Sequence, residues 1–220
     1  MNRLSTTKKM VEDLFRMNSN SNITIIDNAS TYPPLLEWYE KIKSDITIHR
    51  NKTNLGPWSF FYSGISGTVK DTHYVYSDAD LELNPDMPYN WQEIMMEYLN
   101  KYKRKPSLAL RISDIPEGDL RNQILNHQNI CWDKTDEPDV YLAVTDMTFT
   151  LDAKVNGYRY PSVRLAGNFE CRHIPWYLDM DNLPEEEKYY IEHLDDRFPE
   201  ARWSKLNKEK LCMNQQKSTH

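Results

Sequence analysis

Strand-like and helix-like segments alternate along the first half of the chain, and this alternation limits the fold more than any other feature. Compact β-branched or aromatic runs predict strands at 23–26, 46–50, 72–77 and 107–112. Apolar residues at helical spacing predict helices at 10–16, 33–43, 58–63 and 90–102. Such a succession favours an α/β fold with an open sheet. We therefore expect one domain whose central sheet is mixed but mostly parallel and is flanked by helices.

The second half of the chain is less regular. We expect a helix at 120–132, one or two strands within 140–151, a loop-rich aromatic stretch at 159–177, and a helix with an acidic first turn at 184–194. After Lys205 the sequence is polar and loses its periodicity, so residues 206–220 are expected to form a linker or tail. Such a tail suggests that the chain is one domain of a longer polypeptide.

Composition and charge narrow the class of protein. The 220 residues suffice for one substantial domain, and the net charge of −6 argues against nucleic acid as the partner. No apolar run reaches the length of a membrane span, and the N-terminus lacks the apolar core of a signal peptide. The three cysteines are odd in number and have no metal-binding spacing, which suits a reducing compartment such as the cytoplasm.

An acidic pair follows the third predicted strand. Asp78 and Asp80 are separated by one residue, and carboxylates at this spacing point to the same side while the chain stays extended. Such a pair can hold one hard divalent ion, Mg²⁺ or Mn²⁺, and leave positions open for phosphate oxygens. A strand of an α/β sheet would deliver the pair to the carboxyl edge, where these sheets bind ligands. The alternative is a polar turn that ends the strand, because Asp is common in turns.

A set of motifs in a fixed order resembles that of glycosyltransferases with the GT-A fold. The motifs are Ile25-Ile-Asp-Asn-Ala-Ser30, Asn54-Leu-Gly56, Tyr76-Ser-Asp-Ala-Asp80, and a late segment that ends in His173-Ile-Pro-Trp-Tyr177. The likeness covers roughly residues 1–205. Within the family it is nearest to a small N-terminal domain of a chlorovirus protein that builds the capsid glycan, which implies the host cytoplasm as the location.

The resemblance implies two halves of a single domain. Residues 1–105 would bind the nucleotide-sugar, and residues 106–205 would form a smaller, irregular acceptor-binding half. Asp78 and Asp80 would hold the divalent ion against the donor diphosphate, with Asp78 also touching ribose or metal-bound water. His173 would complete the coordination, and its imidazole favours Mn²⁺ over Mg²⁺.

Two further motifs would bind the nucleotide. By the resemblance, Asp27 and Asn28 sit where the family recognises base and ribose, often of a uridine nucleotide. An Asx-turn that ends the strand is the alternative for both residues. Asn54 and Gly56 lie on the next loop at the same edge, where glycine would allow close approach of a ligand. Gly-Pro is also an ordinary entrance to a helix.

Three arginines are candidates for the diphosphate, because the guanidinium fork matches phosphate geometry. They are Arg3, Arg164 and Arg172. Enzymes of this family usually open with a strand just before the residues that correspond to Asn2-Arg3-Leu4. The sequence begins at that point, so this strand is expected to be missing or very short.

The acceptor hydroxyl needs a base in an inverting displacement. Asp114 and Asp146 both follow apolar strands beyond the acidic pair, and Asp146 is favoured because the second half would build the acceptor site. A turn or capping role is the alternative for each. Trp132, Trp176 and Tyr177 are candidates for stacking on sugar faces, with core packing as the alternative.

The leading hypothesis is therefore a metal-dependent glycosyltransferase that moves a hexose-type sugar from a UDP-sugar to a glycan or a protein-linked glycan. A metal-dependent phosphohydrolase is a weaker alternative, because Glu82 stands where such enzymes usually carry Thr or Val. A nucleotidyltransferase is another, although the chain has no Gly-rich phosphate loop near its first strand. A non-catalytic sugar-binding module fits the aromatic content but gives the paired carboxylates no role.

Overall fold

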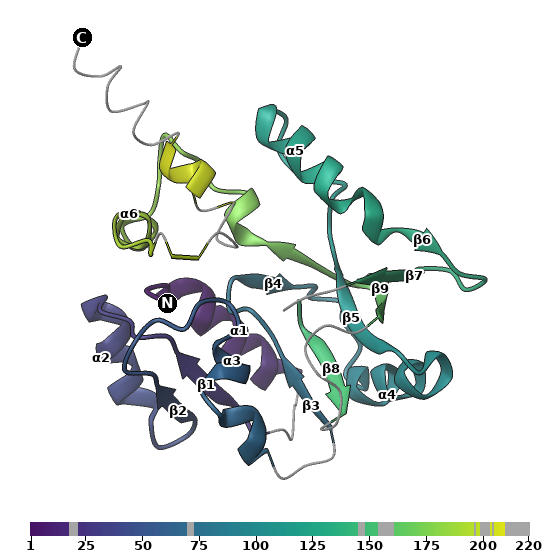
Figure 1. Ribbon diagram of the computed structural model, residues 1–220, viewed down its shortest axis with the longest axis horizontal. Helices are drawn as coiled ribbons and strands as arrows, with labels where there is room; N and C mark the ends of the chain where they lie inside the picture. The colour runs from purple at the N-terminus through teal and green to yellow at the C-terminus, as the bar shows by residue number, and fades with distance from the viewer. Residues whose placement is uncertain are drawn as a thin grey trace.

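The structure of the protein is a computed structural model. It describes residues 1–17, 22–69, 73–144, 148–153, 161–195, 197–198, 203 and 205–209. The described elements form an α/β arrangement with a mixed sheet and flanking helices, as Figure 1 shows. This coarse fold class was predicted correctly from the alternation of strands and helices.

The strands that the structure describes form two sheets. A parallel pair, β1 (Thr24–Asp27) and β2 (Thr47–Arg50), makes the smaller sheet. The larger sheet has the order β3-β8-β5-β9-β7-β6, and β4 pairs with β9 off this path. Its strands are β3 (His73–Tyr76), β4 (Leu81–Leu83), β5 (Lys105–Leu110), β6 (Asp133–Lys134), β7 (Val140–Val144), β8 (Thr150–Ala153) and β9 (Pro161–His173).

The predicted majority of parallel pairs is wrong. Among the described strands, only β1–β2 and β5–β9 are parallel, and the other five pairs are antiparallel. The physical reason lies in the second half, where β8 inserts antiparallel between β3 and β5 and β7 returns beside β9. Strands that return without a crossover helix pair in the antiparallel sense.

The prediction of a loop-rich stretch at 159–177 is also wrong. Residues Pro161–His173 form β9, which pairs with β5, β7 and β4. Its alternation of apolar and polar residues is interrupted at Ala166-Gly167-Asn168, so the local pattern predicts a continuous strand only weakly. Pairing with three neighbouring strands satisfies its backbone and outweighs that weak local signal.

The helices agree well with expectation. They are α1 (Leu4–Arg16), α2 (Pro33–Ile42), α3 (Ser59–Tyr62), α4 (Trp91–Tyr102), α5 (Asp119–Gln128) and α6 (Glu185–Glu192), with short 3₁₀ turns at Ile65–Thr68, Asn129–Cys131 and Ile174–Trp176. The helix predicted at 10–16 begins earlier than expected, at Leu4. Residues 206–209 of the predicted tail are helical, and 210–220 lie outside the described residues. Within the described ranges, no helix has the length and apolar character that crossing a membrane requires.

The main core lies between α4 and one face of the large sheet. Trp91, Met95 and Leu99 of α4 are buried together with Leu108 of β5 and Leu165 of β9. These helix residues recur at the i, i+4 and i+8 spacing of an amphipathic helix. Burial of these side chains supplies the hydrophobic stabilisation of this half of the molecule.

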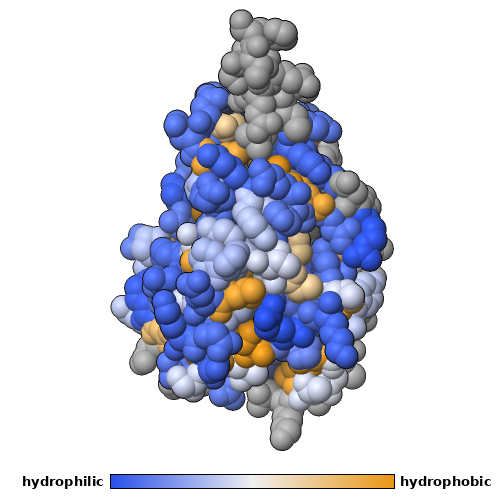
Figure 2. Space-filling view, turned by 90° about the vertical axis from the view of Figure 1, so that its left-hand side faces the viewer, coloured by the Kyte–Doolittle hydropathy of each residue, from blue (hydrophilic) through white to orange (hydrophobic). Residues whose placement is uncertain are grey.

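The opposite face of the same strands is polar and buried. Ser107, Thr150, Asp152 and Ser162 are all fully buried there. Lys105 Nζ lies 2.6 Å from Oδ2 of Asp152 in β8, so this polar layer contains a buried ion pair. The molecular surface drawn in Figure 2 is also mostly hydrophilic, and its apolar side chains form small separate patches.

Candidate functional site

The first predicted nucleotide-binding residues lie at the carboxyl ends of β1 and β2. Because β1 and β2 are parallel, the loops that follow them meet at one edge. Asp27, the last residue of β1, is buried: its Oδ2 accepts from the Ser30 amide at 3.1 Å and from Arg50 Nε at 3.2 Å. Tyr39 donates to Oδ1 at 3.3 Å. Asp27 therefore links the turn after β1 to α2 and β2 through buried hydrogen bonds.

Asn28 joins the two loops at this edge. Its Nδ2 donates to Asn54 Oδ1 at 2.6 Å and to the Gly56 carbonyl at 2.9 Å, while its Oδ1 accepts from the Leu55 amide at 2.8 Å. Gly56 has φ +74°, and a Cβ there would lie 2.4 Å from the ring of Phe198. The structure thus brings Asn28, Asn54 and Gly56 together, and only glycine fits beneath Phe198.

The second residue of the acidic pair meets two partners that were expected near it. Asp80 Oδ2 lies 2.5 Å from Arg3 Nη1 and 3.8 Å from His173 Nε2. The pairing of β4 with β9 explains the approach, because Leu81 is opposite His173 and the Ile174 amide donates to the Asp80 carbonyl at 2.9 Å. The N-terminal segment and the end of β9 therefore converge on one carboxylate that directly precedes β4.

Arg3 is held by a residue that the sequence did not single out. Glu187 of α6 accepts from Arg3 Nε at 2.8 Å and from Nη2 at 3.1 Å, a bidentate pair across 184 positions. The ring of Tyr190 lies 3.8 Å from the guanidinium carbon. The acidic first turn of α6 was the available signal, but it was interpreted only as a match to the helix dipole.

The neighbouring Glu186 ties the same helix to α1. Its Oε2 accepts from the amides of Leu4 and Ser5, each at 2.9 Å. The first amides of a helix lack partners within it, and here a carboxylate from a distant helix satisfies two of them. This contact explains why α1 begins at Leu4, and Figure 1 shows α6 close to the N-terminus.

Asp78 belongs to the same electrostatic neighbourhood. The pKa of the Met1 amino group is lowered, first by burial and then by Arg3, while the charges of Asp27, Asp80 and Asp78 act to raise it. All three carboxylates therefore act electrostatically on the Met1 amino group. Burial alone would raise the pKa of Asp80, but the charges of His173 and Arg3 outweigh it and lower that pKa.

The residues present fit a divalent ion only in part. In the described part of the chain, no group of three His, Cys, Asp or Glu side chains is placed to hold a metal. Asp80 and His173 are close enough to act as two ligands, and Asp80 Oδ1 is buried without a hydrogen-bond partner among the described residues. Mg²⁺ and Mn²⁺ often take one or two protein ligands and complete their shell with water and phosphate. Asp80 and His173 suit that kind of site.

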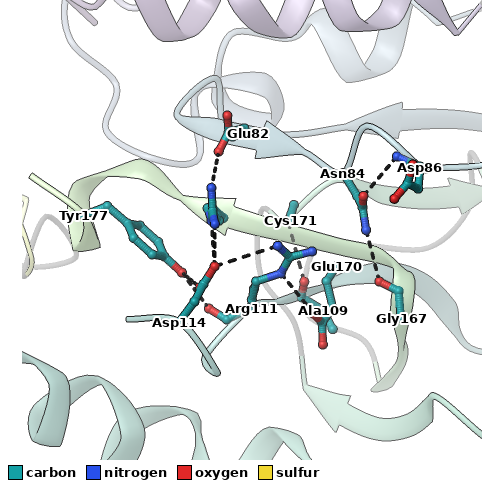
Figure 3. Close-up of polar contacts among 11 residues, drawn as sticks. Glu82, Asn84, Asp86, Ala109, Arg111, Asp114, Gly167, Glu170, Cys171 and Tyr177 are labelled. Carbon is teal, nitrogen blue, oxygen red and sulfur yellow. Dashed lines mark hydrogen bonds and ion pairs between the residues drawn. The ribbon is translucent and has the colours of Figure 1, made fainter. Parts of the chain in front are cut away.

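Arg172 and Asp114 lie in a different cluster. Arg172 is opposite Glu82 in the β4–β9 pairing, and adjacent strand residues point to opposite faces, so Arg172 points away from the side of His173. Its Nη2 lies 2.5 Å from Asp114 Oδ2, and Tyr177 donates to Asp114 at 2.8 Å. Figure 3 shows Asp114 and Tyr177 on one side of the strand, below Glu82.

This cluster bears on the predicted role of Asp114 as a base. Burial would raise its pKa, but hydrogen bonds from Arg172 and Tyr177 outweigh burial and lower the pKa. A carboxylate held in this way is a weak proton acceptor near neutral pH. The geometry therefore engages Asp114 in an ion pair with Arg172.

The remaining predicted residues are not gathered at the acidic pair. Arg164 is buried in the middle of β9, opposite Ser107, and its Nη1 donates to Gln128 of α5 at 2.6 Å. Asp146 lies outside the described residues. Trp176 is buried in the main core, with its ring centroid 4.9 Å from that of His173.

Comparison with known proteins gives no match: neither a family model, nor a curated protein, nor a solved structure is similar to the chain. The chemistry of the site therefore has to follow from its own residues.

Proposed function

We propose that the protein is a glycosyltransferase that takes a sugar from a nucleoside-diphosphate donor, most simply a UDP-sugar, and passes it to a carbohydrate acceptor. One observation carries the proposal: His173 lies 3.8 Å from Asp80 although β9 is far from the acidic pair in sequence. That juxtaposition was expected from the ordered motifs that resemble the GT-A family. Asn28, Asn54 and Gly56 meet at the neighbouring edge, where they bond to one another.

The chemistry of these side chains suits the departure of a diphosphate. Asp80 and His173 would hold Mn²⁺ or Mg²⁺, which when bound would neutralise the charge that grows on the leaving diphosphate. Arg3 presents a guanidinium at the same carboxylate and can donate to phosphate oxygens. Glu187 and Tyr190 hold that guanidinium in place, so its orientation is set before a ligand arrives.

Calorimetric titration tests the proposal. UDP, GDP and UDP-sugars are titrated with and without Mn²⁺ into the wild type, Asp80→Asn and Glu82→Gln. We expect a uridine diphosphate to bind in the presence of Mn²⁺, and Asp80→Asn to weaken that binding by about tenfold or more, since a metal ligand is lost. Glu82→Gln is the matched control, because Glu82 pairs with Arg172 on the other side of the strand.

Circular dichroism establishes that each variant is folded. The proposal fails if no nucleoside diphosphate binds to the wild type in the presence of Mn²⁺. It also fails if Asp80→Asn binds the donor as tightly as Glu82→Gln does.

A further inference from the structure

One guanidinium serves two carboxylates at the site. Arg3 donates through Nε and Nη2 to Glu187 and through Nη1 to Asp80. The exposed fractions of the three side chains are 9% for Arg3, 3% for Glu187 and 15% for Asp80. Weak exposure to water strengthens these electrostatic contacts, so the charge on Asp80 is already balanced within the protein.

Arg3 makes more hydrogen bonds to Glu187 than to Asp80. Glu187 engages Arg3 through two parallel hydrogen bonds, and Tyr190 covers the guanidinium from one side. Asp80 engages it through the single nitrogen Nη1. A bidentate pair is the stronger and more oriented of the two kinds of contact. Glu187 is therefore the anchor of Arg3, and Nη1 is the part that can change its partner.

A divalent ion at Asp80 would meet this guanidinium. Both cations favour the same carboxylate, and they repel each other at short range in a poorly hydrated site. We propose that Arg3 competes with a divalent cation for Asp80, and that Nη1, once displaced, donates to the diphosphate while Glu187 keeps the rest of the side chain in place. The diphosphate part of this inference rests on the proposed function.

Arg3 then couples the binding of the divalent cation to the binding of the diphosphate. A cation at Asp80 releases an oriented, charged donor for phosphate, and phosphate that accepts from Nη1 leaves Asp80 open to the cation. Thermodynamic linkage requires these two effects to be equal, so Mn²⁺ should tighten UDP binding by the same factor as UDP tightens Mn²⁺ binding. Part of that factor should disappear when Arg3 is replaced.

The first test uses Mn²⁺ alone, followed by electron paramagnetic resonance of the free ion. Arg3→Met removes the competitor and leaves both Asp80 and Glu187 to the metal, so Mn²⁺ should bind about tenfold more tightly than to the wild type. Arg172→Met is the matched control, because that arginine pairs with Asp114 and Glu82 away from the site. It should change the Mn²⁺ affinity by less than about twofold.

A second variant predicts a change of opposite sign. Glu187→Gln keeps Arg3 but removes the charge of its anchor, so the guanidinium is balanced by Asp80 alone and should hold it more firmly. Mn²⁺ should then bind more weakly than to the wild type. This variant keeps the inference testable if Arg3→Met does not fold.

The outcomes separate this inference from the proposed function. Unchanged or weaker Mn²⁺ binding to folded Arg3→Met, or unchanged binding to Glu187→Gln, would overturn the competition at Asp80. The diphosphate step is tested by UDP titrations with and without Mn²⁺, in which the coupling factor of Arg3→Met should be about tenfold smaller than that of the wild type. An unchanged factor overturns that step. If UDP fails to bind at all, the proposed function falls while the Mn²⁺ result still decides the competition.

Discussion

At the scale of single residues, the molecule places charges in its interior and balances each with a specific partner. Arg3 is shared by Asp80 and Glu187 near the predicted nucleotide edge, and Lys105 is paired with Asp152 beneath the large sheet. Both arrangements join residues that are distant in sequence. Buried pairs of this kind contribute little net stability, yet losing one member is costly because it strands the other.

The Lys105–Asp152 pair gives a stability prediction. The exposed fractions of these side chains are 2% and 0%, so Asp152→Asn removes the carboxylate charge beside a buried ammonium. We expect the free energy of unfolding to fall by about 3–5 kcal/mol. Adding Lys105→Met to that variant should recover part of the loss, because the stranded charge is then gone.

Urea denaturation followed by fluorescence measures these changes. The matched control is Lys43→Met, which breaks the exposed pair with Glu40, where the exposed fractions are 64% and 71%. This control should change the free energy of unfolding by about 0–1 kcal/mol. Equal losses in Asp152→Asn and Lys43→Met would contradict the prediction.

At the scale of elements, α6 decides how the N-terminal segment is held. Its first turn supplies Glu186 to the first amides of α1 and Glu187 to Arg3. Tyr189 of the same helix donates to Thr31 at 3.0 Å, beyond the end of β1. One late helix therefore contacts both α1 and the edge that carries the predicted nucleotide-binding residues.

Removing the carboxylate that caps α1 tests this dependence. Glu186→Ala should lower the free energy of unfolding by about 0.5–2 kcal/mol, as the loss of an N-cap does. The amides of Leu4 and Ser5 should exchange faster with deuterium, as measured by hydrogen-exchange mass spectrometry. Glu185→Ala is the control, because Glu185 is exposed in the same turn. Equal exchange at these amides in the two variants would refute the capping role.

At the scale of the whole molecule, the core that encloses Cys171 keeps its thiol protonated to higher pH than in the unfolded chain. Burial raises the pKa of the Cys171 thiol from 9.0 to about 12, chiefly through loss of contact with water. The native state therefore holds this proton at pH values where the unfolded chain releases it. The contribution to stability is complete below pH 9.0 and is lost as the pH rises toward about 12.

The alkaline limb of the stability curve should show this loss. Between pH 7 and pH 10, we expect the thiol of Cys171 to account for a fall of about 1.4 kcal/mol in the free energy of unfolding. Urea midpoints at the two pH values measure the fall, which Cys171→Ala should reduce. Cys131→Ala, which removes another buried thiol, controls for lost packing. A fall that is the same in both variants would exclude Cys171 as its source.

The sequence by itself determined most elements of the first half, with β4 (Leu81–Leu83) as a strand that it did not predict. The strands near Ile25, Ile48 and Val75, and the helices between them, carry their own periodicity and turn residues, so local interactions suffice to predict them. The candidate residue Asn28 directly follows β1, and Asp80 lies in the short segment between β3 and β4. The meeting of Asp80 with His173 was also expected, but from the family resemblance rather than from any local pattern.

Only the tertiary structure decided that Pro161–His173 is a strand, that most strand pairs are antiparallel, and that Glu187 holds Arg3. None of these features has a local cause. The backbone of β9 is satisfied by three other strands, and the charge of Arg3 is balanced by a helix 184 positions away. Their energy comes from contacts that exist only after the chain has folded, so no window of the sequence contains it.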